Sequence, residues 1–441
     1  MVFGIFRRGA HVDDRVEAHL RQIGERCEAE SHGSVVLRGW TRHDGACTET
    51  GPPQAGERPM TRPMQAQNPL RETITLPPPL SGPAREIAVL RFGTPGARPK
   101  AYLQAGLHAD EFPGMLALHE LVPLLAEAGN QGRIVGEIVV VPVCNPVGLS
   151  QAVHGAVRGR YETAGGENFN RGWPDLAEDV AGRVAGRLGG DAAANVAIIR
   201  QAMGDLVAAM PRETEITALR QALMTLAHDA DYVLDLHADS EAEVHLYIGT
   251  PLWPDAADLA QEIGARAVLL EEVSGGNPFD EACSGPWWSL ARRFPGQPVP
   301  PACLSATVEL RSNNQVDETL ARKDAAALLS FLVRRGVVQG EAGPLPEPLC
   351  DATPLDGMQQ LTAPVAGLIL YRADLGERVR AGQVVAEIVD PLGTTTPVVA
   401  VTDGVLFARL EQRFAWEGRI IGKIAGAEPL ASRIGTTLLP A

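Results

Sequence analysis

The sequence predicts an α/β fold with a largely buried sheet, followed by a small all-β domain. Between residues 84 and 340, short apolar runs alternate with longer stretches of helical period, as expected for an α/β domain. Beyond residue 354 the helical period vanishes, and short β-like runs are separated by glycine-containing turns. We therefore expect an α/β domain over 84–340, a Pro- and Gly-rich linker over 341–354 and a β-sandwich domain over 355–441.

The individual elements follow from local patterns. A helix is expected from Pro113 to Gly129, because proline suits the first helical turn and glycine suits the position after the last. The run 134–143 is rich in β-branched residues and too continuous for a strand exposed on one face. The other expected strands are 87–92, 101–107, 231–236, 243–249, 266–270 and 304–310, and the other expected helices are 193–209, 213–228, 254–265 and 316–335.

Composition narrows the class of protein. The chain has 441 residues, 45% of them hydrophobic, and a net charge of −15, which argues against nucleic acid and anionic membranes as partners. No apolar run approaches the ~18 residues of a membrane span. Six scattered cysteines without a CxxC pair indicate reduced thiols and a cytoplasmic protein. Residues 1–70 lack a clear pattern and are expected to be a disordered or loosely attached extension, and homo-oligomerisation remains open.

Three residues predict a metal site. His108 and Glu111 lie three positions apart, just after a predicted strand, and His237 follows a second strand. Because ligands in α/β sheets collect at the carboxyl ends of strands, one cleft can hold all three. Two His and one Glu leave the fourth position of a tetrahedral Zn²⁺ open for water, as in a hydrolase. Asp235 and Asp110 are candidates to orient these ligands.

Two further groups predict catalytic and binding roles. Glu309 lies between apolar neighbours in a predicted strand, where burial raises a carboxyl pKa and suits it to carry a proton. Arg160, Asn170 and Arg171 lie in a stretch rich in Gly, Asn and Pro. Such a loop can form an anion pocket for a substrate carboxylate, or one arginine can stabilise an oxyanion.

The order His-x-x-Glu, Arg-Tyr, Asn-Arg, Asp-Leu-His and a strand Glu resembles the zinc carboxypeptidase superfamily, in particular its succinylglutamate desuccinylase/aspartoacylase branch. The resemblance covers about residues 84–340. It implies a central mixed sheet flanked by helices and hydrolysis of an amide bond in an N-acyl amino acid. By position it implies one Zn²⁺ per chain on His108, Glu111 and His237, Glu309 as general base and acid, Arg160 as carbonyl polariser, and Asn170 with Arg171 as carboxylate binders.

The sequence departs from this family at three places. Ala109 stands where glycine is usual, Asn168-Phe169 replaces Asp-Leu, and the stretch between Arg160 and Asn170 is longer than usual. The C-terminal part resembles a lipoyl- or biotinyl-type β sandwich, but the expected hairpin, 389–394, has no lysine to carry a cofactor. We therefore expect a packing or lid domain there.

Two alternatives remain. The same residues would serve a metallocarboxypeptidase that acts on peptide C-termini, and a non-catalytic binding protein could retain the fold. The motif Gly285-Pro-Trp-Trp also has two interpretations. It can form a loop that lines the pocket, or its tryptophans can pack in the core.

Overall fold

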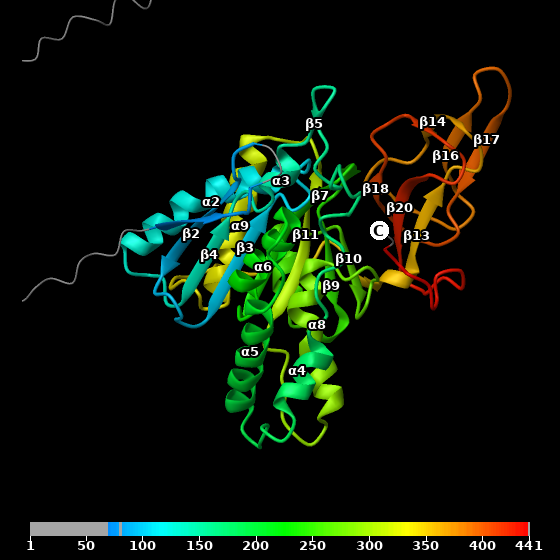
Figure 1. The fold of residues 1–441 in the computed structure, drawn as a ribbon. Helices are drawn as coiled ribbons and strands as arrows, with labels where there is room; N and C mark the ends of the chain where they lie inside the picture. Colours follow the sequence, from blue (N-terminus) through cyan, green and yellow to red (C-terminus); the bar gives the residue numbers. More distant parts are fainter. Residues whose placement is uncertain (1–68, 79–81, 440–441) are drawn as a thin grey trace, which may run out of the picture. The chain divides into compact units, whose positions relative to one another are not determined.

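The computed structural model describes residues 69–78 and 82–439. Its centre is a nine-stranded mixed sheet in the order β1-β2-β4-β3-β7-β11-β9-β10-β12 (Figure 1). The four central strands, β4, β3, β7 and β11, are parallel to one another. β2 pairs antiparallel with β4, β1 with β2, and β9 with β11. The strands are β1 (Leu70–Thr75), β2 (Glu86–Gly93), β3 (Lys100–Ala105), β4 (Glu137–Val141), β7 (Tyr232–Asp239), β9 (His245–Gly249), β10 (Ala267–Glu271), β11 (Leu304–Ser312) and β12 (Ala352–Pro354).

Helices cover both faces of this sheet, so its central strands β3 and β4 are buried along their whole length, whereas the edge strand β1 is partly exposed. One apolar core unites the sheet with α2 (Pro113–Asn130), α7 (Ala257–Ile263) and α9 (Glu318–Arg334). The other unites it with α4 (Ala177–Val184), α5 (Ala192–Ala208), α6 (Glu215–Ala227) and α8 (Phe279–Arg293). Burial on both faces explains the continuous apolar run of β4. The predicted mixed sheet flanked by helices is confirmed.

The C-terminal region forms two antiparallel sheets around their own apolar core. One contains β13 (Met358–Thr362), β20 (Ile420–Gly426), β18 (Gly404–Arg409) and β15 (Arg378–Val379), and the other β17 (Thr395–Val399), β16 (Val384–Val389), β14 (Gly367–Tyr371) and β19 (Phe414–Ala415). The β16–β17 hairpin lies where the sequence predicted one. The predicted all-β region is thus confirmed.

Strand pairing joins this all-β region to the α/β part. β8 (Glu241–Ala242), which follows β7, pairs antiparallel with β18. Its Glu241 carboxylate forms ion pairs with Arg409 and Arg413 of the all-β region. A buried cluster that includes Leu269, Phe407 and Leu438 packs beneath this junction. The all-β region is therefore fixed against the sheet edge that carries β9 and β10.

Several segments differ from the sequence-based expectation. The expected linker 341–354 ends in β12, which pairs with β10 and extends the sheet. The Gly285-Pro-Trp-Trp motif lies inside α8, and Trp287 is fully buried, so the core-packing alternative holds. The extension predicted for residues 1–70 lies outside the described residues, except for the start of β1.

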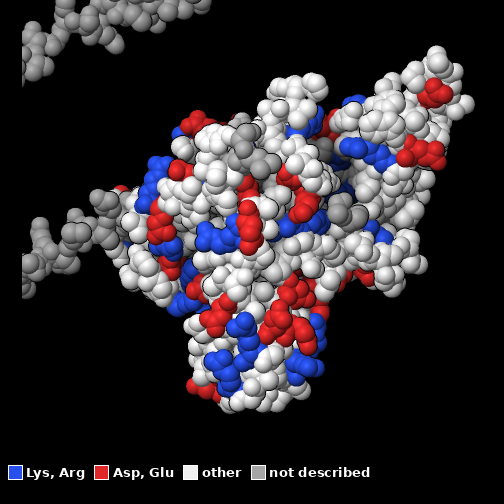
Figure 2. Space-filling model, in the orientation of Figure 1, with Lys and Arg blue, Asp and Glu red and all other residues white. Residues whose placement is uncertain are grey.

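Charged side chains of both signs lie on the surface. Acidic and basic side chains are interspersed over the face drawn in Figure 2. Within residues 69–78 and 82–439, none of the helices combines the length and the apolarity that crossing a bilayer requires.

The junction between the two regions yields a stability prediction. Phe407→Ala removes a fully buried ring from the cluster at the junction and should destabilise the protein by about 3–5 kcal/mol. Phe414→Ala is the matched control, because this ring is 38% exposed and surface changes usually stay within about 0.5 kcal/mol. Urea unfolding followed by tryptophan fluorescence measures both, and equal effects would contradict the assignment of Phe407 to the junction core.

Candidate active site

The predicted site residues converge at the carboxyl ends of three neighbouring parallel strands. His108 and Glu111 follow β3, His237 lies near the end of β7, and Glu309 lies near the end of β11. Glu309 and His237 are direct partners in the register of β11 and β7. Gly106 makes the turn after β3 with φ +73°, a left-handed conformation that glycine adopts without strain. Residues distant in sequence thereby share one cleft.

His108, Glu111 and His237 form a compact and buried cluster. Their potential ligand atoms all lie within 4.8 Å of one another. Nδ1 of His108 lies 3.0 Å from Oε1 of Glu111, and Nδ1 of His237 lies 2.8 Å from Oε2 of the same carboxylate. All three side chains are at most 4% exposed. The carboxylate therefore links the two imidazoles.

The far nitrogen of each imidazole has its own partner. Nε2 of His237 lies 2.9 Å from Oδ2 of Asp235, as the sequence predicted for this aspartate. Nε2 of His108 lies 2.8 Å from Oδ1 of Asn168, which the sequence analysis had noted only as a departure. Gln104 in turn donates to Asp235 at 2.9 Å. The Nε2 atoms of both rings thus face oxygen acceptors, and the Nδ1 atoms of both rings face Glu111.

No such bond involves Asp110, the other candidate to orient a ligand. Its Oδ1 atom is buried and has no hydrogen-bond partner among the described residues. Its neighbour Ala109, found where glycine is usual, is fully buried. Two glycines pack closely against it: a Cβ at Gly148 would lie 3.2 Å from the Ala109 methyl group, and a Cβ at Gly159 would lie 2.7 Å from the Ala109 Cα.

Arg160 follows Gly159 directly and reaches the cluster. Its Nη1 lies 3.0 Å from Oε1 of Glu111 and 3.2 Å from Nδ1 of His108. The side chain is 45% exposed, so it approaches from the open side of the cleft. A cation thus contacts two of the three candidate ligands, and the arginine expected near the reacting carbonyl does lie at the site.

Glu309 has the environment of a proton carrier. Its Oε2 atom is buried without a hydrogen-bond partner among the described residues. Burial, and next the negative charge of Glu111, raise the pKa of Glu309 to about 8, against the opposing positive charges of His237 and Lys423. A carboxyl group poised near neutral pH can both accept and return a proton.

Asn170 and Arg171 lie on the loop between β6 (Ala156–Val157) and α4, as predicted. Oδ1 of Asn170 accepts from the backbone N–H of Phe279 at 2.8 Å, which leaves its amide N–H₂ directed toward the His237 side, 3.5 Å from Nε2. Nη1 of Arg171 donates to the Asn170 carbonyl at 2.7 Å, and its Nε is buried without a partner. Both side chains therefore keep donors for a ligand.

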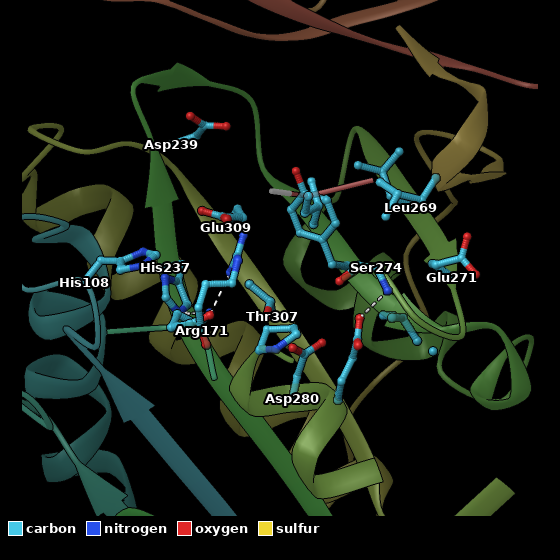
Figure 3. A pocket seen from close by; sticks show the side chains of 18 of the residues that line it. His108, Arg171, His237, Asp239, Leu269, Glu271, Ser274, Asp280, Thr307 and Glu309 are labelled. Carbon is cyan, nitrogen blue, oxygen red and sulfur yellow. Dashed lines mark hydrogen bonds between the residues drawn. The ribbon is translucent and has the colours of Figure 1, made fainter. Parts of the chain in front are cut away.

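Of the residues predicted for the site, all except Glu111 line one cleft: His108, Arg160, Asn170, Arg171, His237 and Glu309. The all-β region and the C-terminal segment contribute three residues to the lining: Leu355, Lys423 and Leu439. Nζ of Lys423 forms an ion pair with Asp239, the last residue of β7. Figure 3 shows the cleft from close by, with Arg171 and Glu309 near His237.

The donor set fits a divalent metal ion. Two imidazole nitrogens and a carboxylate oxygen are the ligands that catalytic Zn²⁺ sites use. Both imidazoles present Nδ1 to the same point and are held through Nε2 by hydrogen-bond acceptors, which is the usual outer arrangement of metal-bound histidines. Their buried position matches that use.

A buried His-Glu-His cluster beside a cleft at the strand ends is the kind of site that zinc hydrolases have. A model of the succinylglutamate desuccinylase/aspartoacylase catalytic domain matches residues 97–335, more than half of the chain. The chain belongs to this family, and the resemblance inferred from the sequence motifs is confirmed. The comparison with curated proteins found no match.

Solved structures agree on the fold. A protein assigned to the succinylglutamate desuccinylase/aspartoacylase class from Shewanella frigidimarina is similar with a TM-score of 0.73 and 24% identity, over 81% of this chain and 97% of that one. A family protein from Shewanella amazonensis gives 0.71 and 26%, over 80% and 98%. One from Rhodobacter sphaeroides gives 0.57 and 17%, over 82% and 97%.

The site includes two residues that the sequence analysis missed, Asn168 and Lys423. Asn168 was visible as the residue two positions before Asn170, the place where the family usually has aspartate. Lys423 carried no local signal, because only the packing of the all-β region brings it to the cleft.

Asn168 gives a prediction about metal affinity. Asn168→Ala removes the acceptor for Nε2 of His108 and should weaken binding of Zn²⁺ by about 10–100-fold. Asn130→Ala, at an exposed helix end, should leave the affinity unchanged. Competition with a chromogenic chelator measures both dissociation constants, and an unaltered affinity in Asn168→Ala would show that the bond does not position the imidazole.

Proposed function

We propose that the protein is a zinc-dependent hydrolase that cleaves the amide bond of an N-acyl amino acid. One observation carries the proposal: the His108–Glu111–His237 cluster opens onto a cleft that also holds Glu309 and Arg171. Membership of the desuccinylase/aspartoacylase family supports the same reaction class. One Zn²⁺ per chain and a cytoplasmic location belong to the same proposal.

His108, Glu111 and His237 would hold the metal ion, with Asn168 and Asp235 fixing the orientation of the rings. When bound, Zn²⁺ supplies a Lewis acid that polarises the scissile carbonyl and lowers the pKa of a water molecule. The remaining chemistry depends on residues of this chain.

Glu309 is the proposed general base and acid. Its carboxylate takes a proton from the attacking water and returns it to the nitrogen of the leaving amino acid as the amide bond breaks. Its raised pKa suits this exchange, since a carboxyl with an ordinary pKa of about 4.3 would return the proton poorly. Arg160, close to the ligands, is the proposed donor to the carbonyl oxygen on which negative charge develops.

Asn170 and Arg171 are the proposed binding site for the free carboxylate of the substrate. The guanidinium group of Arg171 forms no ion pair with a described carboxylate and has a fork of donors suited to one. Its stem lies so close to Gly276 that a Cβ there would come within 2.5 Å of the Arg171 Cδ. Glycine at 276 thus lets the arginine reach the cleft, and positioning of the carboxylate places the amide beside Glu309.

A carboxypeptidase acting on peptide C-termini is the rival function. The contribution of Leu355, Lys423 and Leu439 to the cleft lining favours small substrates, because the all-β region and the C-terminal segment restrict the space available to a long peptide. The experiment is a turnover screen of the zinc-loaded protein against N-acyl amino acids and against short peptides. Preferential hydrolysis of peptides would replace the proposal with its rival.

Glu309 gives the sharpest test of the mechanism. Glu309→Gln keeps the shape of the side chain but removes its ability to accept a proton, so kcat should fall about 10²–10⁴-fold. Zinc content should be unchanged, because Glu309 is not a ligand, and it is checked by atomic absorption. The control is Glu318→Gln in the exposed first turn of α9. If zinc-bound Glu309→Gln kept nearly wild-type turnover, Glu309 would not be the general base and acid.

Arg171 tests the carboxylate site. Arg171→Met removes charged hydrogen bonds worth about 1.5–3 kcal/mol, so KM for an N-acyl amino acid should rise roughly 10–100-fold. Arg187→Met, on an exposed turn, is the matched control. In the wild type, a substrate whose carboxylate is converted to an amide should have a higher KM than the carboxylate substrate. Arg171→Met should change the KM of that amide substrate little. Steady-state kinetics with both substrates decides the point.

A further inference from the structure

One end of the cleft carries three carboxylates that form no ion pair with a described lysine or arginine. Glu271 is the last residue of β10, and Asp280 and Glu281 lie in the first turn of α8. The other noncatalytic acid of the lining, Asp239, is paired with Lys423. The guanidinium of Arg171 interacts electrostatically with Asp280 and Glu281, but one cation against three acids leaves this end of the cleft with excess negative charge.

Two polar side chains at this end are buried without the partners they require. Asp280 is 6% exposed, and its Oδ1 has no hydrogen-bond partner among the described residues. Ser274 is 5% exposed, and its Oγ has none either. Acids in the first turn of a helix commonly balance the helix dipole, but that role needs no buried and unpaired oxygen. Because buried polar groups are normally hydrogen-bonded, the pair indicates a ligand.

Asp280 lies close to Glu309, the proposed general base and acid. Thr307 precedes Glu309 by two positions on β11, so both side chains point to the same face, roughly 7 Å apart along the strand. The Thr307 side chain lies beside Asp280, and the two are neighbours in Figure 3. Phe279, directly before Asp280, is bound through its N–H to Asn170. The side chain of a bound substrate amino acid is therefore long enough to reach Asp280 while its amide lies beside Glu309 and its carboxylate beside Asn170 and Arg171.

Hydrogen bonds fix the position of the loop that carries Ser274. The backbone carbonyl of Ser274 accepts from the N–H groups of Leu438 and Leu439, at 3.0 and 2.9 Å. Gly276 and Asn277, on the same loop, accept from the N–H groups of Gly172 and Trp173. The groups around Asp280 are thus preorganised, which reduces the cost of binding a ligand.

We infer that Asp280, with Ser274 and the surrounding carboxylates, binds a positively charged group on the side chain of the substrate amino acid. The substrates would then be N-acylated amino acids that carry a side-chain amine or guanidinium. This inference rests on the proposed function and specifies its substrate class. Burial and the charge of Glu281 raise the pKa of Asp280 to about 7, and a cation beside it stabilises the charged carboxylate that would otherwise be disfavoured.

The test compares substrates that differ only in the side-chain charge. The zinc-loaded full-length protein is assayed with the Nα-acetyl and Nα-succinyl derivatives of ornithine, lysine, norleucine and glutamate. We expect kcat/KM for the cationic substrates to exceed that for norleucine about tenfold or more, as for a charge-assisted hydrogen bond. Equal or better hydrolysis of the norleucine or glutamate derivatives would overturn the inference while leaving the proposed function intact.

Variants locate the selectivity. Asp280→Asn should lower the ratio of kcat/KM for lysine over norleucine derivatives about tenfold, and the loss should appear mainly in KM. Ser274→Ala, which removes one hydroxyl, should lower the ratio less and serves if Asp280→Asn does not fold. Asp179→Asn, an exposed acid in the first turn of α4, is the control with the same charge change. A ratio unchanged in Asp280→Asn and in Ser274→Ala would also overturn the inference.

A separate binding measurement distinguishes this inference from the proposed function. If no acyl amino acid is hydrolysed, the proposed function fails. Calorimetry with free ornithine and free norleucine then still tests the cleft, and tighter binding of ornithine supports the inference. Ornithine that binds no better than norleucine contradicts it.

Discussion

The site depends on one buried carboxylate. Glu111 is only 3% exposed, and isolation of such a charge from water costs several kcal/mol unless it is paired. Oε1 faces His108 and Arg160, while Oε2 faces His237 and accepts from the backbone N–H of Ala238 at 3.0 Å. The carboxylate thus ties the turn after β3 to β7. Because each partner is needed to satisfy it, both imidazoles have defined positions.

Periodicity in the sequence predicted the elements that hold this site. The strands that carry or precede His108, His237 and Glu309 are buried on both faces, so their runs of mostly apolar residues were easy to recognise. Convergence of the three residues followed from the general rule that ligands gather at strand ends. The local signals were sufficient because the chemistry lies directly on the elements that form the core.

Other parts depend on contacts that no local pattern reveals. Pro286 interrupts the pattern of α8, yet Phe279, Cys283, Trp287 and Leu290 form a buried stripe that keeps the segment helical despite the lost N–H. Likewise, β12 lies in the segment predicted as a linker from its Pro- and Gly-rich composition, but pairing with β10 makes it a strand. In both cases tertiary contacts outweigh intrinsic preference.

The position of Asn168 illustrates how charge limits this cleft. Glu111, Asp235 and Glu309 already place three carboxyl groups around the two imidazoles, and the pKa of Glu309 rises in part because of Glu111. An aspartate at 168 would add a fourth negative group against His108, at a point where burial makes repulsion strong. Asparagine accepts the same hydrogen bond from Nε2 without charge, while its Oδ1 also accepts from the N–H of Asn170 at 2.9 Å. The departure from the usual residue thus keeps the orientation of His108 and joins it to the carboxylate-binding loop without adding to the repulsion on Glu309.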